Sequence, residues 1–252
     1  MIDEHEWESA FPEFSVDSLP HLTTEQMIEV DRAMIEDHRI ELIQMMENAG
    51  RNLARLSKVR YMDCAVDGSN VVVLAGRGGN GGGALVAARR LHCWGANVRV
   101  LVTRSAESFE GVLAHQLSIV ERLGIVADDM SLPEGKVDVI LDGLIGYSLS
   151  GNPSGRAAEL IHWANEQSVP TIALDTPSGL DTTTGQVFVP AIMASSTLTL
   201  ALPKAGLFSS AAQHQVGELY LGDISVPPEV YTAMGLAIPR SLFAGEDIVR
   251  IV

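Results

Sequence analysis

Apolar residues at helical spacing predict two helices near the start of the chain. Thr23 and Gln26 have the spacing of a capping box, and Met27, Val30 and Met34 follow at the interval of one helix face. The apolar face predicted for a second helix consists of Leu42, Met46, Ala49, Leu53 and Leu56. Methionine stripes of this kind are more typical of core packing than of a cofactor site, because the flexible thioether fills irregular gaps.

From residue 70 onward, short runs rich in β-branched residues alternate with segments of helical length. The predicted strands are residues 71–75, 98–102, 137–142, 171–175, 197–201 and 218–221, and the predicted helices are residues 82–93, 106–123 and 156–167. Nearly continuous apolar runs are typical of strands buried on both faces of a parallel sheet. The alternation therefore predicts an α/β fold in which a mostly parallel, Rossmann-like sheet carries helices on both faces.

The composition favours a single domain. A chain of 252 residues with 46% hydrophobic and 19% charged residues can bury one large core. We assign residues 21–252 to this domain, and residues 1–20, which are acidic and contain two prolines, to an extended arm lying on the body or on a partner. The acidic start is unlike a signal peptide, and the apolar runs are too short to cross a bilayer. We therefore expect a cytoplasmic protein with no membrane contact.

Charge and cysteine content exclude several classes of function. A formal net charge of −15 argues against a nucleic-acid partner, because such binding depends on clustered Lys and Arg. Cys64 and Cys93 are too few and too far apart for a disulfide framework or a CxxC site, so we expect two reduced, packed thiols. The histidines lack metal-binding spacing. A small anion can still bind where backbone amides supply the contacts.

A run of glycines follows the first strand of the alternating part. Residues 76–83 read Gly-Arg-Gly-Gly-Asn-Gly-Gly-Gly, and the next helix is predicted to begin near Ala84. Missing side chains let the backbone approach a ligand, and free amides at a helix start favour a phosphate. Gly76, Gly78 and Gly81 also fit GxGxxG, although a tight turn needs glycines even without a ligand. No Walker lysine follows, which excludes a P-loop.

Two later strands each end in an aspartate, Asp142 and Asp175. The carboxyl ends of parallel strands meet at one edge of a sheet, so both carboxylates are expected near the glycine run and one shared ligand. Either aspartate alone could simply cap a turn. Oxygen atoms of Asn80, Asp142 and Ser178 would suit a non-transition cation. Ser178 is not a hydrolase nucleophile, because Thr176 occupies the place of the glycine that a nucleophile elbow requires.

Two basic residues follow strands at the same edge. Lys204 comes after the fifth predicted strand, where it either assists a phosphate or a proton transfer or lies in a solvated turn. Arg104 ends the second strand, where NAD dehydrogenases carry an acidic residue for the ribose. Arg104 therefore faces a 2′-phosphate or is a solvated surface side chain.

Three ordered motifs carry a family resemblance. Residues 76–91 resemble the pattern GxGNNGGDGLVAARxL, residues 142–151 resemble DALFGxGLxG, and residues 175–185 match DxPSGLDxxTG at every fixed position. The opening helix, including Asp31, and the segment 46–50 are also similar. On these motifs the chain, from about Leu22 to Pro227, resembles the NAD(P)H-hydrate epimerase family, whose domain is also called YjeF N-terminal-like.

The resemblance implies a fold, a reaction and a set of site residues. The fold would be a three-layer αβα sandwich with two N-terminal helices, often a homodimer. The enzyme would be an isomerase that interconverts the R and S epimers of NADHX or NADPHX, in which water has added to the nicotinamide ring. A separate NAD(P)H-hydrate dehydratase would then use the S form. The implied potassium ligands are Asn80, Asp142 and Ser178.

Residues that the resemblance places against the dinucleotide are Gly79, Asn80, Gly81, Gly82, Gly83, Gly146, Tyr147, Ser148, Leu149, Ser150, Gly151, Asn152 and Asp175; we add Lys204 from its place at the strand end. As the catalytic residue, Asp175 would exchange a proton with the hydrated ring. Replacing it by Asn is expected to suppress epimerisation and leave folding intact.

The chain departs from the family pattern at two positions of the glycine run. Gly79 and Gly83 stand where the family has asparagine and aspartate. The loss of the carboxylate favours an alternative in which a nucleotide-binding or scaffold module has lost the reaction. A third interpretation, an NAD(P)-dependent dehydrogenase, is disfavoured because the acidic residue of the second strand and a separate substrate domain are both missing.

Overall fold

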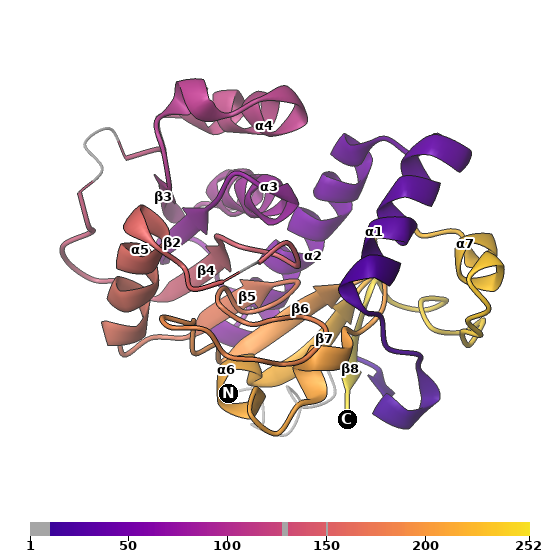
Figure 1. The fold of residues 1–252 in the computed structure, drawn as a ribbon. Helices are drawn as coiled ribbons and strands as arrows, with labels where there is room; N and C mark the ends of the chain where they lie inside the picture. The colour runs from indigo at the N-terminus through magenta and orange to yellow at the C-terminus, as the bar shows by residue number, and fades with distance from the viewer. Residues whose placement is uncertain (1–10, 128–130, 150) are drawn as a thin grey trace.

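The computed structural model describes residues 11–127, 131–149 and 151–252, and it shows a single sheet between helical layers (Figure 1). The strands are β1 Glu13–Phe14, β2 Asn70–Ala75, β3 Asn97–Val102, β4 Val139–Gly143, β5 Thr171–Leu174, β6 Ser196–Leu200, β7 Glu218–Gly222 and β8 Ile248–Ile251. The α-helices are α1 Thr24–Arg32, α2 Leu42–Tyr61, α3 Gly79–Cys93, α4 Gly111–Arg122, α5 Gly155–Glu166, α6 Gln213–Val216 and α7 Pro228–Ala233.

The eight strands form one sheet in the order β1-β8-β7-β6-β5-β4-β2-β3. All neighbours are parallel except β7 and β8, which are antiparallel. The chain runs outward from β2 to β3 and then crosses back to place β4 on the other side of β2. This reversal separates the loops that follow β2 and β4, and such a switch point is where open α/β sheets bind ligands.

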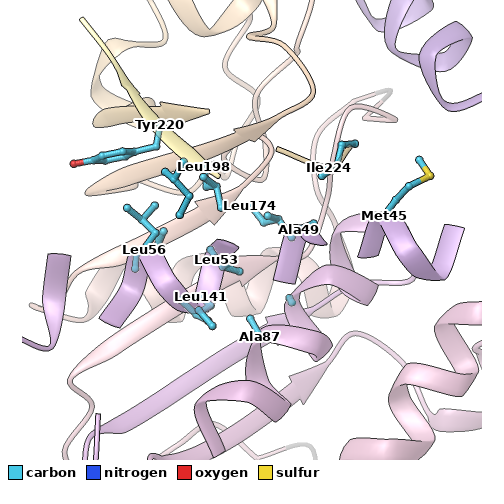
Figure 2. Packing of buried hydrophobic residues seen from close by; sticks show 14 of the residues in the cluster. Met45, Ala49, Leu53, Leu56, Ala87, Leu141, Leu174, Leu198, Tyr220 and Ile224 are labelled. Atoms are coloured by element: carbon cyan, nitrogen blue, oxygen red, sulfur yellow. The ribbon is translucent and has the colours of Figure 1, made fainter. Parts of the chain in front are cut away.

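Alternate residues of the central strands pack into two separate apolar layers. Val71 and Val73 of β2 contact the layer that includes Leu53 of α2, whereas Val72 and Leu74 contact the layer formed with α5. Figure 2 shows the first layer, in which Leu53 and its neighbours on α2 lie against side chains of the sheet. Helices α2, α3 and α4 therefore cover one face of the sheet and α5 covers the other. The prediction of a three-layer, mostly parallel α/β fold is confirmed.

Several predicted boundaries were wrong for local reasons. The helix predicted at 106–123 divides into a short 3₁₀ turn, Ala106–Ser108, and α4, because Phe109 and Glu110 between them are extended. The helix predicted to begin near Ala84 begins at Gly79. Strand β5 ends at Leu174, since Asp175 has a φ of 65° and leaves the strand conformation. The first helix continues after Arg32 as one π-helical segment, Ala33–Asp37.

The described part of the proposed N-terminal arm, residues 11–20, is attached to the domain. Strand β1 adds to β8, which the sequence pattern missed because each strand is very short. Phe11 is buried, and its ring meets Tyr220 edge to face at 5.6 Å between centroids. Residues 1–10 of the arm lie outside the described residues. Within the described residues, no helix is both long and apolar enough to cross a membrane.

Candidate active site

The amino end of α3 lies at the switch point between β2 and β4. Gly76 donates its N–H to Gly143 O at 3.0 Å, and the helix then begins at Gly79 with Gly78 as its N-cap residue. There is no side-chain cap, so the first-turn amides keep their capacity to donate to a ligand. An exposed group of amide donors at a positive helix end is suited to an anion such as a phosphate.

Glycines of this segment serve two different purposes. A Cβ on Gly76 would lie 1.8 Å from Leu144 O, and one on Gly81 would lie 2.0 Å from Gly76 O. These glycines are required because backbone segments pack against one another, and no ligand is needed to explain them. A Cβ on Gly78 or Gly79 would meet nothing within 4 Å. Gly78 and Gly79 therefore form the open side of the helix start, where a ligand has access.

A small pocket of about 70 Å³ opens beside Gly79, below α1 and α2. Its polar side chains are Asp31, Asn80, Tyr147 and Asp175. Its apolar wall consists of Met27, Leu42, Met45, Met46, Ala49, Leu200 and Ile224. In Figure 2, Met45 and Ile224 lie at one end of the row of α2 and sheet side chains. A larger hollow of about 1280 Å³ beside α7 contains none of the predicted site residues.

Asp175 forms a buried ion pair with Lys204. The Lys204 Nζ donates to Asp175 Oδ1, to Leu200 O at 2.7 Å and to Thr199 Oγ1 at 3.3 Å, and its side chain is fully buried. The expectation of a solvated lysine is therefore wrong, and no donor of Lys204 remains for a phosphate. The hydrogen bonds that described residues make to the Asp175 side chain end on Oδ1. Oδ2 is left for the pocket.

Asp142 and Ser178 lie behind the pocket and are completely buried. Asp142 accepts hydrogen bonds from Ser178 Oγ at 2.7 Å, from Ser178 N at 2.8 Å and from Leu144 N at 3.1 Å. Burial raises the pKa of the Asp142 carboxyl to about 6, although these hydrogen bonds lower it. Asn80 links this group to the pocket, because its Nδ2 donates to Leu174 O at 2.6 Å. The structure thus brings Asn80, Asp142, Asp175 and Ser178 to adjacent strand ends, as the sequence predicted.

A second polar pair lines the pocket from another direction. The hydroxyl of Tyr147, in the loop after β4, donates to Oδ2 of Asp31 on α1. Burial raises the pKa of the Asp31 carboxyl; the Tyr147 hydrogen bond opposes this shift, and the charge of Asp175 adds to it. Burial and the bond to Asp31 also raise the pKa of the Tyr147 phenol. Asp31 had been singled out only through the resemblance, although its spacing from Met27 already placed a carboxylate on the apolar face of the helix.

Other predicted contact residues lie away from the pocket. Gly81, Gly82 and Gly83 are buried within α3, and Gly146 packs against the Asn80 side chain. Ser148, Leu149 and Gly151 are at least partly exposed, and Asn152 Oδ1 accepts from Val189 N at 3.1 Å. Ser150 lies outside the described residues. Arg104 is exposed and lines a separate hollow, and both cysteines are exposed, so the expectation of packed thiols is wrong.

Comparison with known proteins gives the family. Residues 42–206 match the sequence profile described as YjeF-related protein N-terminus. A NAD(P)H-hydrate epimerase from Dehalogenimonas lykanthroporepellens is 44% identical over 91% of this chain and 92% of its own length. A second NAD(P)H-hydrate epimerase, from Rhodopirellula baltica, is 34% identical over 84% of this chain and 87% of its own length.

A bifunctional relative and a solved structure are also similar to this chain. A bifunctional NAD(P)H-hydrate repair enzyme from Salinibacter ruber is 33% identical, and the matched stretch covers 42% of that enzyme. The crystal structure of a yeast protein superposes with a TM-score of 0.75 over 92% of this chain and 100% of that one, at 23% identity, which shows a shared fold. With a profile spanning more than half of its length and two relatives above 30% identity, the chain belongs to the family of YjeF-related N-terminal domains.

Proposed function

We propose that this protein is a NAD(P)H-hydrate epimerase, an isomerase that interconverts the R and S epimers of NADHX or NADPHX. The observation that carries the proposal is the carboxylate of Asp175 in a small, apolar-walled pocket beside the open start of α3. Relatives at 44% and 34% identity bear the name of this activity. Together, the pocket and the relatives support a dinucleotide substrate and proton-transfer chemistry.

The small volume of the pocket indicates that only part of the substrate binds inside it. A volume of about 70 Å³ is too small for a dinucleotide, so the hydrated ring enters the pocket and the remainder stays outside. The pyrophosphate lies at the start of α3, where Gly78 and Gly79 leave the backbone accessible. The methionine and leucine side chains of the wall then hold the hydrated ring and exclude bulk water from it.

Asp175 is the proposed catalytic residue. Lys204, Thr199 and the Leu200 N–H hold Oδ1, which fixes the carboxylate and directs its other oxygen to the pocket. A fixed carboxylate in an apolar pocket can exchange a proton with the hydroxyl of the ring. Lys204 acts as a positioning residue in this arrangement, since its three donors are occupied within the protein.

The proposal includes a potassium ion held by Asn80, Asp142 and Ser178. The residues fit such an ion, because Asp142 is a buried carboxylate whose hydrogen-bond donors are a hydroxyl and two backbone amides. Among the described residues none of these donors is cationic, so the buried charge lacks a counter-ion. Oxygen donors with one carboxylate suit a hard cation. When bound, the ion would supply the positive charge that orders the strand-end loops.

The main rival is a module that has kept the fold and lost the reaction. Its support was Gly83, which replaces the family aspartate. Position 83 does not line the pocket, and a Cβ there would lie 2.7 Å from Leu174 Cδ2 and 3.4 Å from the Ala49 Cβ. A missing carboxylate at this packed position therefore removes nothing from the pocket wall. Asp175 remains as the proton-transfer group.

A coupled assay tests the proposed function. The purified protein is added to R-enriched NADPHX together with an S-specific dehydratase, and the recovery of NADPH is followed by absorbance. We expect faster recovery than with the dehydratase alone. Recovery at the uncatalysed rate would support the inactive module, and a substrate-dependent hydride transfer without the dehydratase would support a dehydrogenase.

The proposal also includes a functional partner and an oligomeric state. Bifunctional repair enzymes in the family support a dehydratase activity as the functional partner. We propose a homodimer on the family resemblance. Light scattering of the purified protein would exclude the dimer if the measured mass were that of one 27.0 kDa chain.

A further inference from the structure

The Asp31–Tyr147 pair lies in the proposed ring pocket and has no role in the proposed function so far. Asp31 comes from α1 and Tyr147 from the loop after β4, whereas Asp175 follows β5. All three side chains line the same small pocket. Tyr147 occupies a variable position of the family motif, and the resemblance implies only a substrate contact for it.

The helix that carries Asp31 is fixed to the loops around Asp175. Thr24 N donates to Thr183 Oγ1 at 2.9 Å, and the hydroxyls of Thr24 and Thr182 lie 2.8 Å apart. Leu22 N donates to Pro203 O at 2.8 Å, directly before Lys204. The capping box of Thr23 and Gln26 also orders the first turn of α1. These bonds hold the two carboxylates on a common framework.

Epimerisation itself calls for two proton-transfer groups. Water adds to an enamine with its hydroxyl on the carbon bonded to nitrogen. To invert that carbon, an acid protonates the hydroxyl, the C–O bond breaks, water leaves, and the nitrogen lone pair forms a C=N bond. A water molecule then attacks the other face of the ring and gives one proton to a base. One water and one proton are released and one of each is taken up, so the reaction balances.

We propose that Asp31 and Tyr147 form a proton relay that serves one face of the hydrated ring while Asp175 serves the other. In the relay, Asp31 is protonated and its hydrogen bond with Tyr147 runs opposite to the one in the structure: Asp31 gives its proton to the Tyr147 oxygen as the Tyr147 proton passes to the leaving hydroxyl. The same path runs in reverse when water adds. A single group on the pocket wall cannot reach a hydroxyl on both faces of the ring. The Asp31–Tyr147 pair is therefore the second proton-transfer group, in addition to Asp175.

The electrostatic environment supports the relay. Asp31 is surrounded by Tyr147, the carboxylate of Asp175 and the ammonium of Lys204. Burial, together with the charge of Asp175, raises the pKa of Asp31, so this carboxyl holds a proton more readily than an exposed aspartate. The raised pKa of Tyr147 keeps its phenol protonated between transfers.

The relay rests on the proposed function and is tested in the same assay with Tyr147→Phe and Asp31→Asn. The matched control is Tyr220→Phe, since Tyr220 donates to Glu218 Oε2 at 2.8 Å outside the pocket. We expect kcat to fall about 100-fold in both relay variants, with KM nearly unchanged, and the control to match wild type. Wild-type kcat is expected to fall as pH rises through the pKa of Asp31, and Asp31→Asn to lose this dependence.

The outcomes separate the relay from the function on which it rests. If the wild-type protein does not accelerate epimerisation, the proposed function fails and the relay with it. If the wild type is active but Tyr147→Phe and Asp31→Asn keep kcat within about twofold of it, the relay alone is overturned. If loss of activity in Asp31→Asn reflects unfolding, thermal melting shows it, and Tyr147→Phe, which removes one hydroxyl, decides. A purely structural pair would lower kcat equally at every pH.

Discussion

At the scale of single residues, the buried Asp175–Lys204 pair controls both chemistry and stability. Asp175 is 2% exposed and Lys204 is 0% exposed, so neither charge is compensated by water. Breaking such a pair leaves one charge buried and unpaired, which costs more than the pair itself contributes. The sequence expectation that Asp175→Asn leaves folding intact is therefore revised, because the substitution strands the Lys204 ammonium.

A double-mutant cycle tests this view of the pair. Lys204→Met and Asp175→Asn are each expected to lower the free energy of unfolding by about 3–5 kcal/mol. The double variant should lose clearly less than the sum, since no unpaired charge remains. Activity should be lost in Asp175→Asn and stay lost in the double variant even where folding recovers. Additive losses of stability, measured by urea denaturation, would show that the two charges do not interact.

The sequence predicted some site residues better than others. Asn80, Asp142 and Asp175 were predicted to meet because each lies at or after the carboxyl end of a strand of one parallel sheet, and strand order brings these ends together. The burial of Lys204 could not be predicted, because it depends on the φ of 65° at Asp175 and on the partners Thr199 and Leu200. The Asp31–Tyr147 contact joins residues 116 positions apart and left no local signal.

At the scale of elements, helix α3 begins earlier than helix propensity predicts. Glycine is a poor helix former, so residues 79–81 were left outside the predicted helix. Tertiary contact overrides that preference here, because α3 packs closely on α2 and β4, and only glycine fits at the contact. Gly50 of α2 also allows the backbones of α2 and α3 to lie close together, since a Cβ on Gly50 would lie 2.4 Å from Gly83 O. Strands β1 and β8 were missed for a different reason, since runs of two and four residues carry too little periodicity.

A pair of alanine substitutions separates packing glycines from ligand-facing glycines. Gly81→Ala places a Cβ about 2.0 Å from the Gly76 carbonyl oxygen, which is backbone and cannot move aside. We expect a loss of about 1–3 kcal/mol in unfolding free energy, or more. A Cβ in Gly79→Ala would meet no atom within 4 Å, so the free energy of unfolding should change by less than about 1 kcal/mol. The change should be an increase, because alanine has the higher helix propensity. Equal melting temperatures for the two variants would contradict the close contact.

At the scale of the whole molecule, the proposed cation site joins three segments that are distant along the chain. Asn80 begins α3, Asp142 lies in β4, and Ser178 follows β5. The side chains of these three residues come together only in the folded state, so an ion bound between them stabilises the fold as a whole. An ion present at 100 times its dissociation constant adds about 2.7 kcal/mol to the free energy of unfolding.

Potassium is therefore expected to raise the melting temperature relative to sodium at equal ionic strength. For a chain of this length each kcal/mol corresponds to about 2–4 °C, so a difference of several degrees is measurable by calorimetry. Asp142→Asn removes the only carboxylate of the proposed ligand set and should abolish the difference between the salts, even though the variant is less stable in both. The exposed-site control Glu36→Gln should keep the full difference, because Glu36 pairs with Arg32 on the surface of the π-helical segment. A potassium effect that survives in Asp142→Asn would place the ion elsewhere in the protein and remove Asp142 from the ligand set.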